Sequence, residues 1–151
     1  MTISPPTIPL TERTAFLAHK VGQLLLARVE GGMQELGLNS RSYFVLTAVD
    51  PEIPRSQQEI SQILTIDPTT MGMVVDDLEA RGLVVRTRNQ RDRRRYDLTL
   101  SDGGANTLAA AHAILGAIEQ DFFSPLSGKQ RGELHGHLQR LVAGRWPPPQ
   151  D

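Results

Sequence analysis

The sequence predicts a mainly α-helical protein with one small β-hairpin, an α+β fold built around a helix-turn-helix. Apolar residues recur at helical spacing through most of the chain. Two short helical segments, each with its own N-cap, are separated only by residues 65–67, as in a helix-turn-helix. After Gly82 the apolar period changes to that of a strand, and a second strand follows an arginine-rich loop.

The composition excludes several classes of protein. The chain has 151 residues, about one domain, with 39% hydrophobic and 22% charged residues, so global disorder is not expected. Its lack of cysteine excludes disulfides, thiolate catalysis and cysteine-bound zinc. No apolar run is long enough to span a membrane and the N-terminus resembles no secretion signal, so we expect a cytoplasmic protein with no membrane partner.

The first part of the chain predicts an arm and one long helix. Residues 1–10 are rich in proline and are expected to form an extended or unstructured arm. The helix is expected to begin at Thr11 as N-cap and to end at Gly37. Gly31 and Gly32 are unfavourable inside a helix and indicate a kink or a close helix crossing.

A second, shorter helix is expected over residues 40–49. Its apolar residues predict that Phe44 and Val45 face the interior. Asp50-Pro51 is expected to stop it.

The helix-turn-helix is marked by two N-terminal signals. Residues 56–59 have the S-x-x-E pattern of a capping box, in which two side chains satisfy backbone N–H groups at the helix start. Asp67 is the N-cap of the next helix, Pro68 occupies its first position, and the helix is expected to run to about Arg81. The residues it is expected to bury are Met71, Val74, Val75 and Leu78.

The hairpin that follows carries a concentrated positive charge. Strands are expected over residues 83–87 and 94–100, joined by a loop over 88–93, which makes the hairpin a wing attached to the helix-turn-helix. Between Arg86 and Arg95 there are six arginines and one acid, so this segment carries +5 while the rest of the chain carries −6. Such a patch attracts a polyanion even when the net charge of the chain is −1.

Two further helices are expected after the wing. Ser101 precedes the first of them, and a capping box over residues 127–130 begins the second. The first has an apolar seam with coiled-coil-like spacing, which we expect to pair with the terminal helices of a second copy of the chain. The seam residues are Leu108, Ala111, Leu115, Ile118 and Phe122.

Three stretches of the sequence resemble the motifs of the MarR family of bacterial transcription regulators. Residues 56–71 look like its helix-turn-helix, residues 78–86 (LEARGLVVR) resemble its L-E-x-x-G-L-V-x-R segment, and residues 92–101 (DRRRYDLTLS) resemble its wing signature. The order and spacing of these motifs extend the resemblance over about residues 10–143.

The resemblance implies a homodimeric repressor that binds a pseudo-palindromic operator in double-stranded DNA. It implies dimerisation helices at 11–38 and 101–143, a DNA-binding lobe at 39–100 and a tail at 144–151. Helix 68–81 would enter the major groove and wing 86–96 the minor groove, with two copies about 34–36 Å apart.

The residues expected to bind DNA lie at the start of helix 68–81 and on the wing. They are Thr69, Thr70, Gly72, Met73, Arg88, Arg91, Arg93, Arg94 and Arg95. By resemblance Asp92 braces the wing tip and Arg94 is the leading candidate for insertion into the groove. The family commonly has a polar or basic residue where Met73 stands, and helix 68–81 has no Lys or Arg before Arg81, so the wing is expected to supply most of the electrostatic affinity.

Many members of the family bind small aromatic or phenolic acids between the dimerisation helices and the DNA-binding lobe. The resemblance makes five residues candidates for such an effector site: His19, Gln23, Arg28, Tyr43 and Phe44. An alternative is that Tyr43 and Phe44 belong to the core and that His19 contacts a partner.

Nothing in the sequence predicts an enzyme, a cofactor or a metal site. His135 and His137 are two apart on a helix and therefore lie on different faces, so they cannot hold one ion together. No nucleophile motif or phosphate-binding loop is present. The alternative to a DNA-binding regulator is a winged-helix interaction module whose arginine loop binds an acidic protein.

Overall fold

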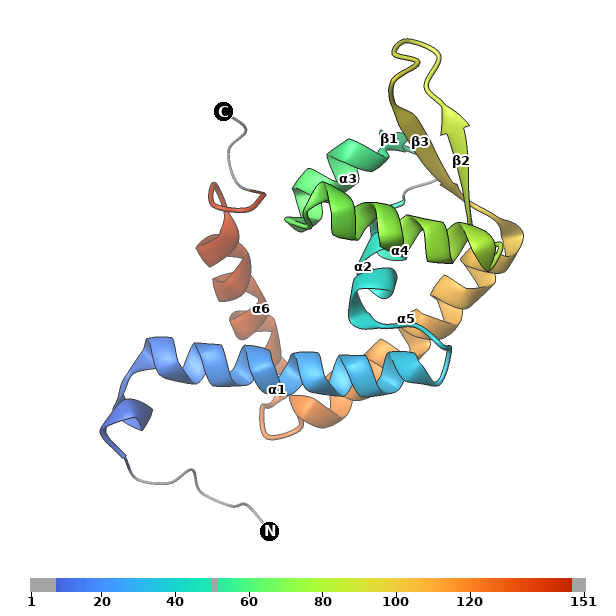
Figure 1. Ribbon diagram of the computed structural model, residues 1–151. Coiled ribbons are helices and arrows are strands. Elements are labelled where there is room, and N and C mark those ends of the chain that lie inside the picture. Colours follow the sequence, from blue (N-terminus) through green and yellow to red (C-terminus); the bar gives the residue numbers. More distant parts are fainter. Residues whose placement is uncertain (1–7, 50–51, 148–151) are drawn as a thin grey trace.

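The computed structural model describes residues 8–49 and 52–147, and it confirms a mainly helical fold with a small sheet (Figure 1). No helix within the described ranges is both long and apolar enough to cross a membrane. The elements are η1 Pro9–Glu12, α1 Thr14–Gln34, α2 Ser40–Ala48, β1 Arg55–Ser56, α3 Gln57–Leu64, α4 Pro68–Ala80, β2 Val84–Arg88, β3 Tyr96–Leu100, α5 Asp102–Phe122 and α6 Gly128–Val142.

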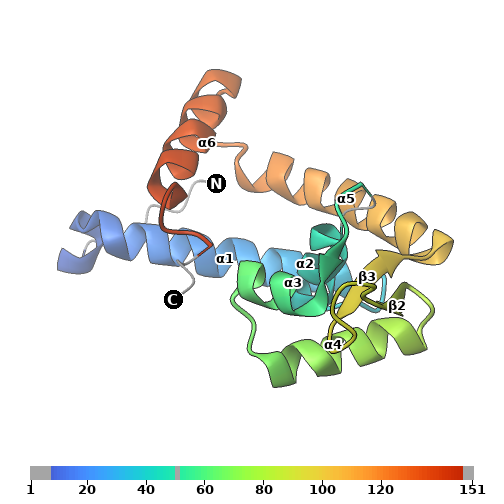
Figure 2. The ribbon, with the colours of Figure 1, turned by 90° about the horizontal axis from the view of Figure 1, so that it is seen from above.

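The elements form a lobe and a helical base. Helices α2, α3 and α4 and the sheet make the lobe, and the β2–β3 hairpin projects from it (Figure 1). Helix α5 begins directly after β3 and runs from the sheet to the base, where α1 crosses it beneath the lobe. Helix α6 follows α5 and rises from the base, apart from the lobe and on the side opposite the hairpin (Figures 1 and 2). The hairpin is therefore remote from α6.

The sheet has three antiparallel strands in the order β1-β3-β2. In the hairpin Val84 pairs with Leu100 and Arg88 with Tyr96, so β2 and β3 begin one and two residues later than the sequence predicts. Strand β1 was not expected, because two residues are too short to show a period-2 pattern. It pairs Arg55 with Leu98 and connects the start of α3 to the wing.

Helix α2 corrects one predicted orientation. Val45 is buried as expected, but Phe44 is 38% exposed and Tyr43 is buried instead. Consecutive helical residues point about 100° apart, and α2 turns Tyr43 toward α5, where its ring packs edge-on against His112 at 6.0 Å. The predicted stop at Asp50-Pro51 lies outside the described residues.

Helix α1 begins later than the sequence predicts, and its last helical residue is Gln34, with the predicted glycine turn at Gly37 just after it. Thr11 is not its N-cap: the residue lies in η1, and its hydroxyl donates to the carbonyl of Ile8 at 2.7 Å. Gly37 adopts φ +65°, the left-handed conformation that suits glycine, just after the helix. The N–H of Leu38 then donates to the carbonyl of Met33 at 3.0 Å and closes the C-terminus.

The crossing of α1 and α5 explains one of the helical glycines. A Cβ on Gly32 would lie 2.7 Å from Ile118 Cδ1 and 2.8 Å from Ile114 Cγ2, whereas one on Gly31 would meet nothing within 4 Å. The close crossing is therefore at Gly32.

Part of the α5 seam packs within its own chain. Ala111 is buried in the core, and Leu108 and Leu115 are partly buried against it, so the pairing of the whole seam with a second copy stays a prediction.

Replacing Gly104 with Ala is expected to destabilise the fold. A Cβ at Gly104 would lie 1.9 Å from the carbonyl oxygen of Leu83, so the start of α5 would have to move off the sheet. We expect a loss of about 1–3 kcal/mol in the free energy of unfolding, measured by urea denaturation.

Gly103→Ala is the matched control for this prediction. Its Cβ would have only an ordinary contact, 3.6 Å from the carbonyl oxygen of Gly82, so a change within about 1 kcal/mol is expected. Equal midpoints for the two variants would contradict the close approach of α5 to the sheet.

Candidate nucleic-acid interface

The capping box at the start of α3 forms as the sequence predicts. The backbone N–H and the hydroxyl of Ser56 donate to Glu59 Oε2 at 2.7 and 2.8 Å, and the N–H of Glu59 donates to Ser56 Oγ at 3.2 Å. The two hydrogen bonds from Ser56, the backbone one first, hold the pKa of Glu59 below its ordinary value of 4.5.

The turn between α3 and α4 is fixed by short-range hydrogen bonds. Thr65 adopts φ 54°, and the buried hydroxyl of Ser61 donates to the carbonyl of Ile66 at 2.6 Å. Asp67 Oδ1 accepts from the N–H of Thr70 at 2.9 Å, which starts α4 at Pro68 as predicted. Bonds from the Thr70 side chain and backbone lower the pKa of Asp67, so this cap is charged at neutral pH.

Helix α4 presents a clean division between buried and exposed faces. The four residues predicted to be buried are buried: Met71, Val74, Val75 and Leu78. Of the residues expected to bind DNA, Thr69 and Met73 are exposed, Gly72 is half-buried beside them, and Thr70 is turned partly toward the lobe. The structure thus places Thr69, Gly72 and Met73 on one accessible face.

Arg86 connects α3, α4 and β2. Its Nη1 lies 2.6 Å from Asp76 Oδ1 and 3.0 Å from Glu79 Oε2, and its Nε donates to Gln57 Oε1 at 3.1 Å. Its Nη2 donates to the carbonyl of Gly72 at 3.4 Å, and the side chain is only 19% exposed. Arg86 is one of the six arginines of the basic segment, but its charge is paired with Asp76 and Glu79 within the lobe.

Sequence reasoning did not assign Arg86 a role, although a signal existed. Asp76 and Glu79 are three residues apart on one face of a helix expected to approach phosphates, and such acids need a cation nearby. The remaining acid, Asp77, lies 3.7 Å from Arg81. The acids of α4 are therefore paired.

Asn89 organises the loop of the wing and was also missed. Its amide nitrogen donates to both carboxylate oxygens of Asp97 at 3.0 Å. Its Oδ1 accepts from the N–H groups of Arg91 and Asp92 at 2.8 and 2.9 Å. Asparagine at the start of a turn commonly bonds the backbone two residues on, which is the signal that could have found it.

Asp92 lies at the base of the arginine-rich turn. Its Oδ1 accepts from the N–H of Arg94 at 3.0 Å, and its carboxylate lies 3.4 Å from Arg94 Nε and 3.6 Å from Arg95 Nε. The backbone N–H of Arg94 is the main cause that lowers the pKa of Asp92. The turn conformation thus depends on a charged Asp92.

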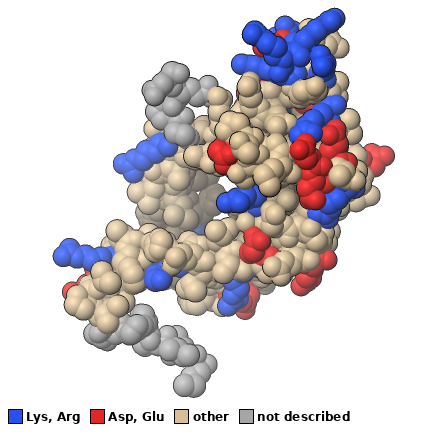
Figure 3. Space-filling view, viewed as in Figure 1, with Lys and Arg blue, Asp and Glu red and all other residues tan. Residues whose placement is uncertain are grey.

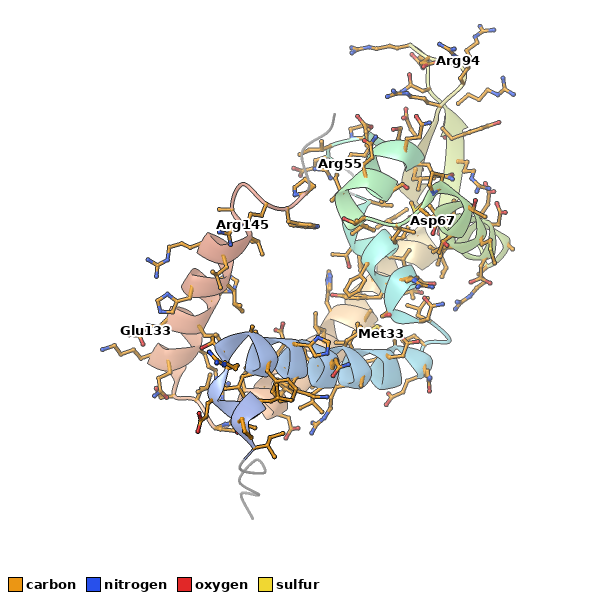
Figure 4. All side chains as sticks on the ribbon, turned by 60° about the vertical axis from the view of Figure 1, so that its left-hand side comes forward. Met33, Arg55, Asp67, Arg94, Glu133 and Arg145 are labelled. Carbon is orange, nitrogen blue, oxygen red and sulfur yellow. The ribbon has the colours of Figure 1, made fainter. Side chains whose placement is uncertain are left out.

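The wing arginines form an exposed basic cluster. They are Arg88, Arg91, Arg93, Arg94 and Arg95, and all five are exposed. Figure 3 shows their charge gathered at the tip of the hairpin, with the acids of α4 in a separate patch below. The Arg94 side chain is 93% exposed and lies at the far end of the wing (Figure 4). This cluster can approach a polyanion without rearranging the lobe.

The structure does not bring the five expected effector residues into one cavity. His19, Gln23 and Arg28 are exposed along α1, and Arg28 pairs with Asp121 of α5 at 2.5 Å. Tyr43 is buried in the core. Phe44 lines a pocket of about 480 Å³ between α1 and the lobe, and the other four residues are not part of its lining.

This pocket is lined by groups of different chemistry. Leu26, Phe44 and Ile66 are apolar, whereas Glu30 and Arg41 are charged. Glu30 Oε2 accepts from the N–H of Ser40 at 2.7 Å, and the bonds from Ser40 lower the pKa of Glu30. Within the described ranges, no group of three or more His, Asp and Glu is placed to hold a metal ion.

Helices α3 and α4 form a helix-turn-helix whose second helix is exposed, and the basic β2–β3 hairpin lies beside it. This arrangement is that of a winged helix-turn-helix protein of the DNA-binding class. The profile of the MarR family matches residues 36–95. A transcriptional regulator of this family from Rhodococcus sp. RHA1 is 27% identical, with a TM-score of 0.80 over 91% of this chain and 96% of that one. In sequence and in fold the chain is therefore similar to the MarR family of transcriptional regulators.

Two other relatives bear on function. The putative transcriptional regulatory protein for the hcr operon of Thauera aromatica is 33% identical over 105 residues, 70% of this chain. The alignment spans 63% of that relative's length. CouR from Rhodococcus jostii RHA1, crystallised with p-coumaroyl-CoA, is 26% identical, with a TM-score of 0.79 over 93% of this chain and 99% of that one.

Glu59→Gln is expected to lower stability most at neutral pH. A lowered pKa in the folded state stabilises the fold above the ordinary value of 4.5, and this contribution is lost as the pH falls through the folded value. The unfolding midpoints of wild type and variant in urea should therefore differ near neutral pH and converge in acid.

Glu133→Gln on α6, outside either capping box, is the control for this pH series. It should follow the wild-type profile. A constant difference between Glu59→Gln and wild type at all pH values would mean that the charge of Glu59 is not what stabilises the start of α3.

Proposed function

We propose that the protein is a transcriptional repressor that binds a pseudo-palindromic operator in double-stranded DNA as a homodimer in the bacterial cytoplasm. The observation that carries the proposal is the exposed cluster of wing arginines next to the accessible face of α4. A lobe that occupies DNA excludes RNA polymerase from the same stretch, so we assign it a repressing role.

The electrostatics of the lobe support this mode of binding. Arg86 and Arg81 pair with the acids of α4, which reduces their repulsion of DNA phosphates. The start of α4 can enter the major groove while the wing reaches the neighbouring minor groove. There an arginine such as Arg94 gains from the negative potential of a narrow, A·T-rich groove.

The helices outside the lobe support a homodimer. Large apolar side chains are exposed along α1, at Leu17, Val21 and Leu24, and on α6, at Leu138 and Leu141. Exposed apolar surface of this extent is typical of an interface. We propose that residues 11–38 and 101–143 hold two copies together, with lobes 39–100 about one DNA turn apart.

We also propose that a small aromatic acid binds in the pocket between α1 and the lobe. Arg41 supplies a cation for a carboxylate, and Phe44 supplies an aromatic face. The relative that was crystallised with p-coumaroyl-CoA makes an aromatic acyl group a reasonable class of ligand. Occupation of this pocket would change the angle between α1 and the lobe, and couplings between such sites are typically about 1–3 kcal/mol.

Arg94→Ala is expected to weaken binding to the operator about ten-fold and to reduce the slope of log K against log salt by about one. The reason is that the Arg94 side chain is 93% exposed at the far end of the wing. The measurement is fluorescence anisotropy with duplexes from upstream of the protein's own gene and a scrambled duplex of equal composition.

Lys129→Ala, which removes an exposed cation from α6, is the control and should bind like wild type. Unchanged affinity in Arg94→Ala would remove Arg94 from its role. Binding to neither duplex at any salt would favour the alternative, a winged-helix module that docks an acidic protein.

Small phenolic acids are expected to raise the Tm of the protein by about 5–10 °C at concentrations near 100 times Kd. Arg41→Gln should abolish this shift, because the carboxylate loses its cation. Arg13→Gln, which removes an exposed cation ahead of α1, should retain it. A panel that leaves the Tm of wild type unchanged would count against the effector site.

A further inference from the structure

We propose that Met73 reads the C5 methyl group of a thymine in each operator half-site, an inference that rests on the proposed function. Met73 is 69% exposed, the highest value among the large hydrophobic side chains exposed within the described residues. It lies on the accessible face of α4, one turn after Thr69. A methionine held in water at this position gains by being covered on binding.

The long charged side chains toward the end of α4 are already engaged. Arg81, at the end of α4, donates to the carbonyls of Gly37 and Leu36. Asp76, one turn after Met73, is paired with Arg86. Thr69 has only a short hydroxyl side chain to offer. Among the described residues on this face of α4, Met73 therefore has the longest side chain not engaged in an ion pair.

Gly72 favours a close approach at the same place. A Cβ added there would meet nothing within 4 Å, so the lobe itself does not require a glycine. The bare backbone instead leaves open space beside Met73, through which the helix can come nearer to the floor of the groove. The flexible thioether side chain then reaches the base edges.

The chemistry of the major groove selects the base. Each base edge there presents hydrogen-bond donors or acceptors, and thymine alone adds a methyl group. Methionine has no donor and only a weak acceptor, so contact with a donor-acceptor edge would leave base atoms unsatisfied. Contact with a thymine methyl buries apolar surface on both partners without that cost.

The test replaces single thymines of the operator with deoxyuridine, which removes the methyl group and nothing else. Replacing one thymine should weaken the binding of wild-type protein about four-fold at either of two symmetry-related positions and nowhere else, which is the effect of one buried methyl group. In Met73→Ala the same substitution should cause no further loss, as a double-mutant cycle requires. Met73→Leu should keep the sensitivity to deoxyuridine.

Val85→Ala removes another exposed apolar side chain from the lobe, on β2, and should keep the full deoxyuridine penalty. A penalty that persists in Met73→Ala, or no sensitive position in wild type, would overturn this inference while leaving operator binding intact. Failure to prefer any native duplex over a scrambled one would instead overturn the proposed function and this inference with it.

Discussion

The arrangement of the DNA-binding lobe depends on Arg86. The backbone of Arg86 lies in β2, and its side chain is 19% exposed. Its guanidinium contacts Asp76 and Glu79 of α4 and Gln57 of α3. Removing Arg86 would leave the carboxylates of Asp76 and Glu79 without their cation. The contacts of Arg86 are therefore expected to be lost together. In combination with the burial of Val84 and Leu98 in the core and the pairing of β1 with β3, these contacts fix the direction of the wing relative to α4.

The pairing of Arg86 with the acids of α4 also means that α4 and the wing contribute differently to DNA binding on the proposed function. The acids of α4 are paired with Arg86 and Arg81, so α4 brings little net attraction for phosphates. Its accessible face, Thr69, Gly72 and Met73, carries no charge. The positive charge available to phosphates is concentrated on the wing, whose turn is held by Asn89 and Asp92. On the proposed function, the wing supplies salt-dependent affinity and α4 supplies the choice of base.

Local signals in the sequence predicted most of the helices and strands. The capping box at Ser56, the Asp67-Pro68 start of α4 and the glycine at the end of α1 depend on residues within one turn, and all three are confirmed. Wrong or missed features depend on distant residues. The spacing of the α5 seam predicts a helix with an apolar face, but it does not specify which surface that face packs against. The orientation of Phe44 follows from the packing of Tyr43 against α5. The contacts of Arg86 join segments up to 29 residues apart. The sequence therefore located the basic wing and, by resemblance, Asp92 at its turn, but it did not identify Arg86 or Asn89 as residues that hold the wing.

The links between the base and the lobe bear on how a signal would reach DNA. Arg81, at the end of α4, donates to the carbonyls of Gly37 and Leu36 at 2.7 and 3.0 Å, just after α1. The close crossing of α1 and α5 at Gly32 lies in the last turn of α1, next to these carbonyls. On the proposed function, a change in the angle of α1 at this end would therefore act on the residues that Arg81 contacts. In a dimer this would alter the separation of two α4 helices, and a fixed DNA repeat tolerates little change in that separation.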